Sequence, residues 1–466
     1  MFDNHKRGDD APYLYRTSDR GRTWQSITGN LPAKGSVHTI AEDHVDPNLL
    51  FVGTEFGLYY SQNGGGNWQQ LKSGFPTIDV RDIEIQRREN DLVVGTFGRG
   101  IYVLDDYSAL RTSASAVASS EATLFEVRDP WMYIEGDLWG GYGGAQASNG
   151  DNFWYAENPP FGAVFTYVLR DGLETQAEAR RKAEREIEKT GGDTPYPSWE
   201  TLRAEDREDE PAIVLTITDA DSNVVRRMTG PKSKGLHRVA WDLRYPAPDP
   251  ARLQAAEVSI FGSAPTGPLV VPGTYTVTMG KRINGVVTPI ASPQSFTVKP
   301  LENSPELATD RAAVLAFQQE TAELSRAVSG AGAASRELRN RVAHLKVAIE
   351  ALPQPNETQR TTAQQIEALL DQSDMALLGD QSVASRNEPV PFSIAQRVGQ
   401  IRGWGWNHQS PVTGSDKTAF DIAKNDFAGV LAQLRDIELR VDALESELAG
   451  LGAPYTPGSG VPSYPR

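Results

Sequence analysis

The sequence contains no cysteine among its 466 residues. Disulfides, cysteine-based zinc sites and a thiol nucleophile are therefore excluded as chemistry for this chain. No apolar run approaches the roughly 18 residues that a membrane-spanning helix needs, so we expect no membrane span. The N-terminal stretch MFDNHKRGDDAPYLY also lacks the hydrophobic region of a signal peptide.

Positive charge is scarce relative to negative charge. Lys and Arg number 46 and Asp and Glu number 61, which gives a net charge of −15. An acidic protein repels phosphate backbones, and the sequence has no long basic run, so nucleic acid is not expected as a partner. Its length corresponds to about three domains.

The common catalytic and cofactor motifs are missing as well. None of the six histidines has the His-Glu-x-x-His spacing, no serine lies in a nucleophile elbow, and there is no Walker A loop. Asp219, Asp221 and Asn223 imitate the start of an EF-hand loop, but the expected glycine is absent and the flanks resemble strands, which favours a plain turn. We therefore expect no catalytic residue, no metal and no cofactor in this chain.

Two related segments stand near the N-terminus, TSDRGRTW at 17–24 and SQNGGGNW at 61–68, with their tryptophans 44 residues apart. In the first, the aspartate can accept backbone N–H groups across a tight turn, and the glycine can adopt a left-handed conformation. The tryptophan is expected to bury its ring under the hairpin. The positions concerned are Thr17, Asp19, Gly21, Thr23 and Trp24, and in the second copy Ser61, Asn63, Gly65 and Trp68.

The surrounding sequence repeats with the same period. The stretch VHTIAEDHVDPNLLFVGTEFGLYYS is echoed by VRDIEIQRRENDLVVGTFGRGIYVLDD. Several short strands per repeat of about 40–45 residues indicate β-propeller blades, and residues 1–111 are predicted to hold the last two or so. A propeller needs at least about four blades. We therefore expect the missing blades upstream in a longer protein or, less favoured, on another chain. The open edge predicts that 1–111 is the least stable part.

Two further regions follow. Residues 120–303 alternate apolar and polar residues, which predicts a β-sandwich, interrupted by a charged helical insertion near 172–208. Residues 304–452 carry apolar residues at steps of three and four, which predicts an antiparallel helical hairpin or bundle. The tail 453–466 is rich in Pro and Gly and is expected to be extended or disordered. The predicted fold class is thus multidomain and mainly β, with an α-helical C-terminal part.

The pattern Thr-x-Asp-x-Gly-x-Thr-Trp resembles the Asp-box, or BNR repeat. Together with YLYRTSDRGRTW, LLFVGTEFGLYYS, RENDLVVGTFGRGIYVLDD, GLHRVAWDLR and PFSIAQRVGQIRGWGWN, the chain resembles the C-terminal half of large bacterial sortilin-like (Vps10-type) propeller proteins, often labelled glycosyl hydrolase. The middle region is similar to the Ig-like sandwich that follows such propellers. This resemblance implies an extracellular or periplasmic location for the intact protein, and a protein or carbohydrate ligand.

Three functions are considered. The first is a non-catalytic binding or scaffold protein. The second is a sialidase-like glycoside hydrolase with its active site mostly on the missing blades; the family's Phe-Arg-Ile-Pro motif is absent from this chain. The third is a subunit of a larger assembly in which the apolar seam at 420–448 pairs with another chain, which requires that seam to be exposed.

The candidate ligand-binding residues are charged residues at strand ends or tryptophans in loops. The charged ones also have a structural interpretation as pairs between neighbouring blades, and for the tryptophans packing is favoured over stacking on sugars. They are Glu55, Arg81, Asp82 and Arg99, and the tryptophans Trp131, Trp139, Trp154, Trp404 and Trp406.

Overall fold

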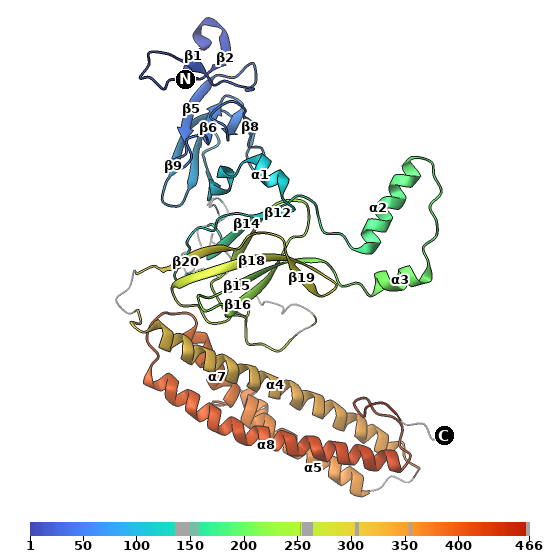
Figure 1. Cartoon of the computed structure of the whole chain (residues 1–466). Helices are drawn as coiled ribbons and strands as arrows, with labels where there is room; N and C mark the ends of the chain where they lie inside the picture. Colours follow the sequence, from blue (N-terminus) through green and yellow to red (C-terminus); the bar gives the residue numbers. More distant parts are fainter. Residues whose placement is uncertain are drawn as a thin grey trace. The chain divides into compact units, whose positions relative to one another are not determined.

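A computed structural model describes residues 1–135, 150, 152, 156, 158–251, 253, 264–302, 307–353 and 357–462. These residues form two compact units. Unit 1 comprises Met1–Trp131, Glu157–Asp242 and Gly273–Lys299, and unit 2 comprises Met132–Ala156, Leu243–Pro272 and Pro300–Arg466. Unit 1 is mainly β and unit 2 mainly helical (Figure 1). The predicted fold class, multidomain and mainly β with a helical C-terminal part, is confirmed.

The N-terminal part of unit 1 consists of small antiparallel sheets. Two of them, which we call the first and second blade sheets, have the strand orders β5-β6-β7-β8 and β11-β10-β9. The strands of the first are β5 (Val37–Glu42), β6 (Leu50–Thr54), β7 (Gly57–Ser61) and β8 (Gln69–Gln70), and those of the second are β9 (Val80–Gln86), β10 (Asp91–Thr96) and β11 (Ile101–Leu104). Before them come β1 (Phe2–Asn4), η1 (His5–Arg7), β2 (Asp9–Tyr13), β3 (Tyr15–Arg16) and β4 (Gln25–Ser26), paired as β1-β2 and β3-β4.

Strand β6 is buried on both faces, because a separate core covers each side of the first blade sheet. Leu50 and Val52 pack with Leu14 and Trp68 in one core, and Phe51 packs with residues of the second blade sheet in the other. The sheets approach so closely that a Cβ on Gly53 would lie 2.5 Å from a methyl of Val80. The two sheets therefore pack face to face.

The rest of unit 1 is a β-sandwich. One sheet has the order β12-β14-β17; the other has the order β13-β20-β18-β15-β16, with β19 paired to β18. Trp241 contacts the rings of Tyr275 and Phe296 across the core, at centroid distances of 5.6 and 6.2 Å. The strands are β12 (Ala122–Leu124), β13 (Trp131–Met132), β14 (Ala163–Leu169), β15 (Ala212–Thr218), β16 (Val224–Gly230), β17 (Gly235–Trp241), β18 (Gly273–Ile283), β19 (Val286–Pro289) and β20 (Gln294–Pro300).

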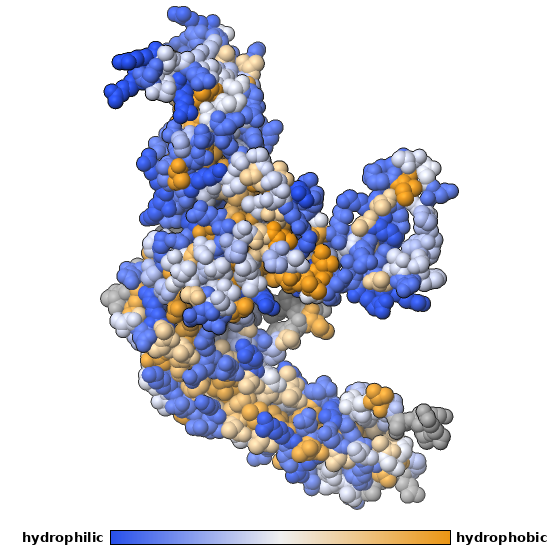
Figure 2. Space-filling view, viewed as in Figure 1, coloured by the Kyte–Doolittle hydropathy of each residue, from blue (hydrophilic) through white to orange (hydrophobic). Residues whose placement is uncertain are grey.

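Short helices join or interrupt these sheets. Helices η2 (Tyr107–Arg111) and α1 (Ala114–Ser119) lead from the second blade sheet to the sandwich, and α2 (Gln176–Lys189) and α3 (Trp199–Asp206) lie within the predicted insertion. No residue of α2 or α3 is buried, and their surface is largely hydrophilic (Figure 2). Arg180 of α2 joins them by pairing with Glu205 of α3 at 2.7 Å.

The helices of unit 2 are α4 (Arg311–Glu350), α5 (Glu357–Leu378), α6 (Gln381–Ala384), α7 (Ile394–Gly405) and α8 (Gly414–Gly450). Helices α4 and α8 run alongside each other, and α5 and α7 complete a shared apolar core (Figure 1). The apolar seam of α8 is buried inside this bundle, so it does not offer the exposed surface that pairing in trans requires. No described helix is both long and apolar enough to cross a membrane.

Candidate functional site

The turn at 17–24 is closed by side-chain hydrogen bonds. The Thr17 hydroxyl accepts the N–H of Gly21 at 2.8 Å and donates to Oδ1 of Asp19 at 2.9 Å. Asp19 also accepts the N–H and the hydroxyl of Thr23, at 2.8 and 2.7 Å. The bond from the Thr23 N–H, followed by that from its hydroxyl, lowers the pKa of Asp19 to about 2. An ionised carboxylate therefore holds this turn.

The second turn keeps the same layout with neutral groups. The Ser61 hydroxyl accepts the N–H of Gly65 at 3.0 Å and donates to Oδ1 of Asn63 at 2.9 Å, and that oxygen accepts the N–H of Asn67 at 2.8 Å. Gly65 has φ +91°, close to the +87° of Gly21 in the first turn. A glycine suits this left-handed region in both copies, so the turn geometry survives the loss of the aspartate.

The two tryptophans differ in environment. Trp68 is 4% exposed; its Nε1 donates to the Ile27 carbonyl at 2.9 Å and its backbone N–H donates to Asn30 Oδ1 at 2.6 Å. Trp24 is 56% exposed, so the prediction that it is buried under its own hairpin is wrong. The Trp68 ring is buried by the preceding repeat. Ile27, whose carbonyl accepts the Trp68 Nε1–H, lies 41 residues earlier in the chain.

The predicted site residue Arg81 lies at one end of the blade sheets, where β9 begins. Its Nη2 pairs with Asp79 at 2.5 Å, and its guanidinium carbon is 5.4 Å from the centre of the Phe97 ring. Nε2 of His38, on β5, is 3.3 Å from the other oxygen of Asp79. Neither Nε2 of His38 nor Oδ1 of Asp79 has a hydrogen-bond partner among the described residues. The end of each sheet thus contributes to one polar cluster.

The other three predicted residues are near this end but have different environments. Glu55 accepts the N–H of Ser36 at 3.3 Å, which ties the β6–β7 loop to β5. Asp82 accepts the N–H of Ile83 at 3.0 Å. Arg99 is exposed in the β10–β11 loop, the same loop as Phe97. The structure therefore brings Arg81 and Arg99 to one exposed loop region, while both carboxylates hold backbone groups.

A buried ionic network near the blade sheets was not anticipated from the sequence. Asp43 is 3% exposed, and Arg111 donates to both of its oxygens at 2.9 Å. The hydroxyl of Tyr107 donates to the same carboxylate at 2.6 Å. Burial alone raises the pKa of Asp43, but the bonds from Arg111 and Tyr107 outweigh burial and hold it well below its usual range. The network ties η2 to the first blade sheet, and 68 residues separate its two charges.

The other candidates from the sequence are the Asp219 turn and the loop tryptophans. Asp219 accepts the N–H groups of Asp221 and Asn223, at 3.0 and 2.8 Å, and so forms the turn that the sequence favours. Trp131 donates its Nε1–H to Glu89 at 3.3 Å, which ties its segment to the β9–β10 loop. Trp404 is 70% exposed. Trp139 and Trp154 lie outside the described residues.

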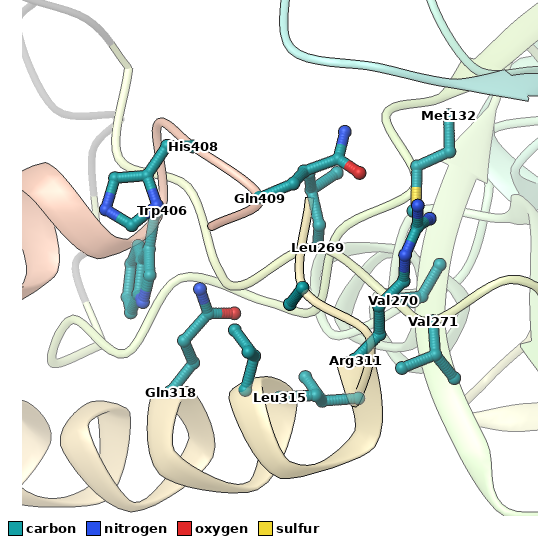
Figure 3. A pocket seen from close by; sticks show the side chains of 12 residues that line it. Met132, Leu269, Val270, Val271, Arg311, Leu315, Gln318, Trp406, His408 and Gln409 are labelled. Carbon is teal, nitrogen blue, oxygen red and sulfur yellow. The ribbon is translucent and has the colours of Figure 1, made fainter. Parts of the chain in front are cut away.

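A pocket inside unit 2 is the second candidate site. It lies between the first turns of α4, the loop after α7 and the segment 269–271 (Figure 3). Its walls are largely apolar side chains, namely Leu269, Val270, Val271, Val314 and Leu315. Arg311, Trp406 and Gln409 add polar groups, and the pattern RGWGWN around Trp406 was its one signal in the sequence.

No protein-family model matches this chain, and no curated protein matches it. Among solved structures it is similar to the extracellular domain of the putative one component system BT4673 from B. thetaiotaomicron, with 11% identity and a TM-score of 0.17. That match covers 62% of this chain and 28% of the other. It is also similar to an ancestral GH74 enzyme, with 12% identity, a TM-score of 0.18, and coverage of 62% and 36%. The chain thus spans well under half the length of either structure.

Proposed function

We propose that this chain is part of a non-catalytic binding or scaffold protein of the exported, sortilin-like Asp-box propeller type. Two features support the proposal. The residues of both repeats have the roles expected in Asp-box turns, down to the hydroxyl and carboxyl or amide oxygens that close them. The repeats also stack as sheets with apolar faces in contact, as neighbouring blades do.

The observation that carries the binding role is the exposed end of the blade sheets. Phe97 is 69% exposed in the β10–β11 loop, and Phe56 is 48% exposed in the corresponding β6–β7 loop. Arg81 stacks on Phe97 and is itself held by Asp79, so this ring and cation are ordered before any ligand arrives. Exposed aromatic and arginine side chains are the types that dominate binding energy in interfaces. Protein and carbohydrate ligands both fit this chemistry.

The carboxylates at this end support binding over hydrolysis. A glycosidase needs two carboxyl groups about 5–10 Å apart on either side of the scissile bond. Glu55 and Asp82 each accept a backbone N–H, and Asp79 is paired with Arg81. These contacts hold the strands and loops in place, which is a scaffold role.

The test compares binding with turnover for the full chain. We expect a glycan array or a peptide display library to give a saturable ligand whose affinity falls about tenfold in Phe97→Ala, as for an aromatic hot spot. Trp199→Ala, which removes a 67% exposed ring on α3, serves as the matched control and should leave affinity unchanged. Hydrolysis of fluorogenic glycosides that is abolished by Glu55→Gln or Asp82→Asn would contradict the proposal.

A further inference from the structure

The pocket of unit 2 contains polar atoms that pair with none of the described residues. They are Nη1 of Arg311, Nε1 of Trp406 and Oε1 of Gln409, all buried and without a hydrogen-bond partner in the described part of the chain. A buried polar atom with no partner carries an uncompensated desolvation cost, so three around one pocket need an explanation.

The indole cannot turn away to find a partner elsewhere. Trp406 is 5% exposed, and its carbonyl accepts a hydrogen bond from Arg244 at 3.1 Å. The guanidinium of Arg402 lies 5.4 Å from its ring centre. Gln318 of α4 donates to the Gly405 carbonyl at 2.5 Å and so fixes the end of α7. The N–H of Trp406 therefore stays in the pocket wall.

The opposite side of the pocket is cationic. Arg311 is the first residue of α4 and has no ion pair within the described residues, whereas its neighbour Asp310 caps the helix by accepting the Ala313 N–H at 2.9 Å. Gln409 lies between Arg311 and Trp406 (Figure 3), and its backbone carbonyl accepts the Ala308 N–H at 2.9 Å. Figure 3 shows Arg311 and Trp406 on opposite sides, with Leu269 and Gln409 between them. A ligand must therefore present more than one polar group.

The three unpaired atoms define the chemistry of that ligand. A guanidinium matches a carboxylate, an indole N–H matches a carbonyl oxygen, and an amide oxygen matches an N–H. The pocket is a depression of about 400 Å³ that includes open solvent at its mouth. The apolar walls suit an aliphatic group on the ligand.

We propose that this pocket binds an N-acylated aliphatic amino acid, either as a small molecule or as the C-terminal residue of a peptide. Arg311 binds the carboxylate, Trp406 donates to the acyl carbonyl oxygen, and Gln409 accepts the amide N–H. The aliphatic side chain packs on Leu269 and Val314. This site is separate from the blade-sheet surface of unit 1, so either proposal can fail without the other.

The experiment titrates the ¹⁵N-labelled full chain and follows its tryptophan indole N–H signals. N-acetyl-leucine and the tripeptide Gly-Gly-Leu are the two source arms. N-acetyl-leucinamide, which lacks the carboxylate, and isovalerate, which lacks the amide, are the chemical controls. We expect a saturable shift of one indole signal that is missing in Trp406→Phe and present in Trp404→Phe. N-acetyl-leucinamide and isovalerate should each bind about tenfold more weakly than N-acetyl-leucine.

Arg311→Gln keeps a donor but removes the charge, and it should weaken N-acetyl-leucine binding about tenfold, while Arg326→Gln on an exposed part of α4 should have no effect. Binding of N-acetyl-leucine alone or of both source arms supports the proposal, and a preference for the tripeptide assigns the site to peptide C-termini. No shift with either arm overturns the proposal and leaves bound water as the partner of these atoms. Equal binding of N-acetyl-leucinamide, or unchanged binding in Arg311→Gln, overturns it as well.

Discussion

The turn at 17–24 has the full pattern Thr-x-Asp-x-Gly-x-Thr-Trp and leaves its tryptophan 56% exposed, whereas the turn at 61–68 has asparagine in place of the aspartate and buries its tryptophan to 4% exposure. The difference is explained by the neighbouring repeat. Gly65 lies so close to Ile27 that a Cβ would be 2.7 Å from the Ile27 Cβ, while a Cβ on Gly21 would meet Trp24 alone, at 3.7 Å. The motif therefore encodes the turn, and the preceding sheet determines burial of the ring.

Removing each tryptophan should give the largest contrast. Trp68→Ala should lower the free energy of unfolding of the blade sheets by about 3–5 kcal/mol, because it opens a cavity between repeats. Trp24→Ala should change it by less than about 0.5 kcal/mol, as expected for an exposed side chain. Hydrogen exchange of the β5–β7 amides measures both. A similar loss in both variants would mean that each turn buries its own ring.

Disrupting the Asp43 network should cause the next largest loss in the free energy of unfolding. Asp43→Asn leaves Arg111 without its partner and should lower the free energy of unfolding by about 3 kcal/mol, whereas Asp82→Asn, an exposed control, should have little effect. Because the folded-state pKa of Asp43 is lowered, its contribution is complete above the unfolded pKa of about 4 and is lost as pH falls below that value. The wild-type chain should therefore lose more stability than Asp43→Asn between neutral pH and acid, measured by denaturant unfolding.

A smaller effect is expected from the residue that holds Trp68 from the preceding repeat. Asn30 accepts the Trp68 N–H at 2.6 Å and donates to its carbonyl at 3.1 Å. Asn30→Ala leaves both groups unpaired and should cost about 1–3 kcal/mol in the same exchange measurement. If Asn30→Ala matched the wild type, the contact between repeats would rest on the apolar core alone.

The smallest effect tests whether aspartate and asparagine are interchangeable in the turn. Asp19 has a lowered pKa of about 2, so its contribution is present above the unfolded pKa of about 4 and is lost as pH falls through 2. Asp19→Asn should make exchange of the Thr23 N–H independent of this titration, and Asn63→Asp should introduce the same dependence at Asn67. An unchanged pH profile in both variants would show that the carboxylate charge plays no part in the turn.

The sequence allowed the local features to be predicted, because their signals are local. The residues of each turn lie within eight positions of one another, and the apolar steps along 420–448 directly indicated a buried helix face. The missed features depend on contacts between distant residues. Asp43 and Arg111 are 68 residues apart, and Arg311, at the start of α4, and Trp406, just after α7, line the same pocket. The residues around each of these positions do not indicate which distant residue it will lie near.

The preceding repeat, and not its own turn, buries the ring of Trp68. Exchange of the two indole N–H protons tests this directly in the unmodified chain. The Nε1–H of Trp68 donates to Ile27, so it should exchange far more slowly than the Nε1–H of the exposed Trp24. Equal exchange rates for the two indoles would contradict the account.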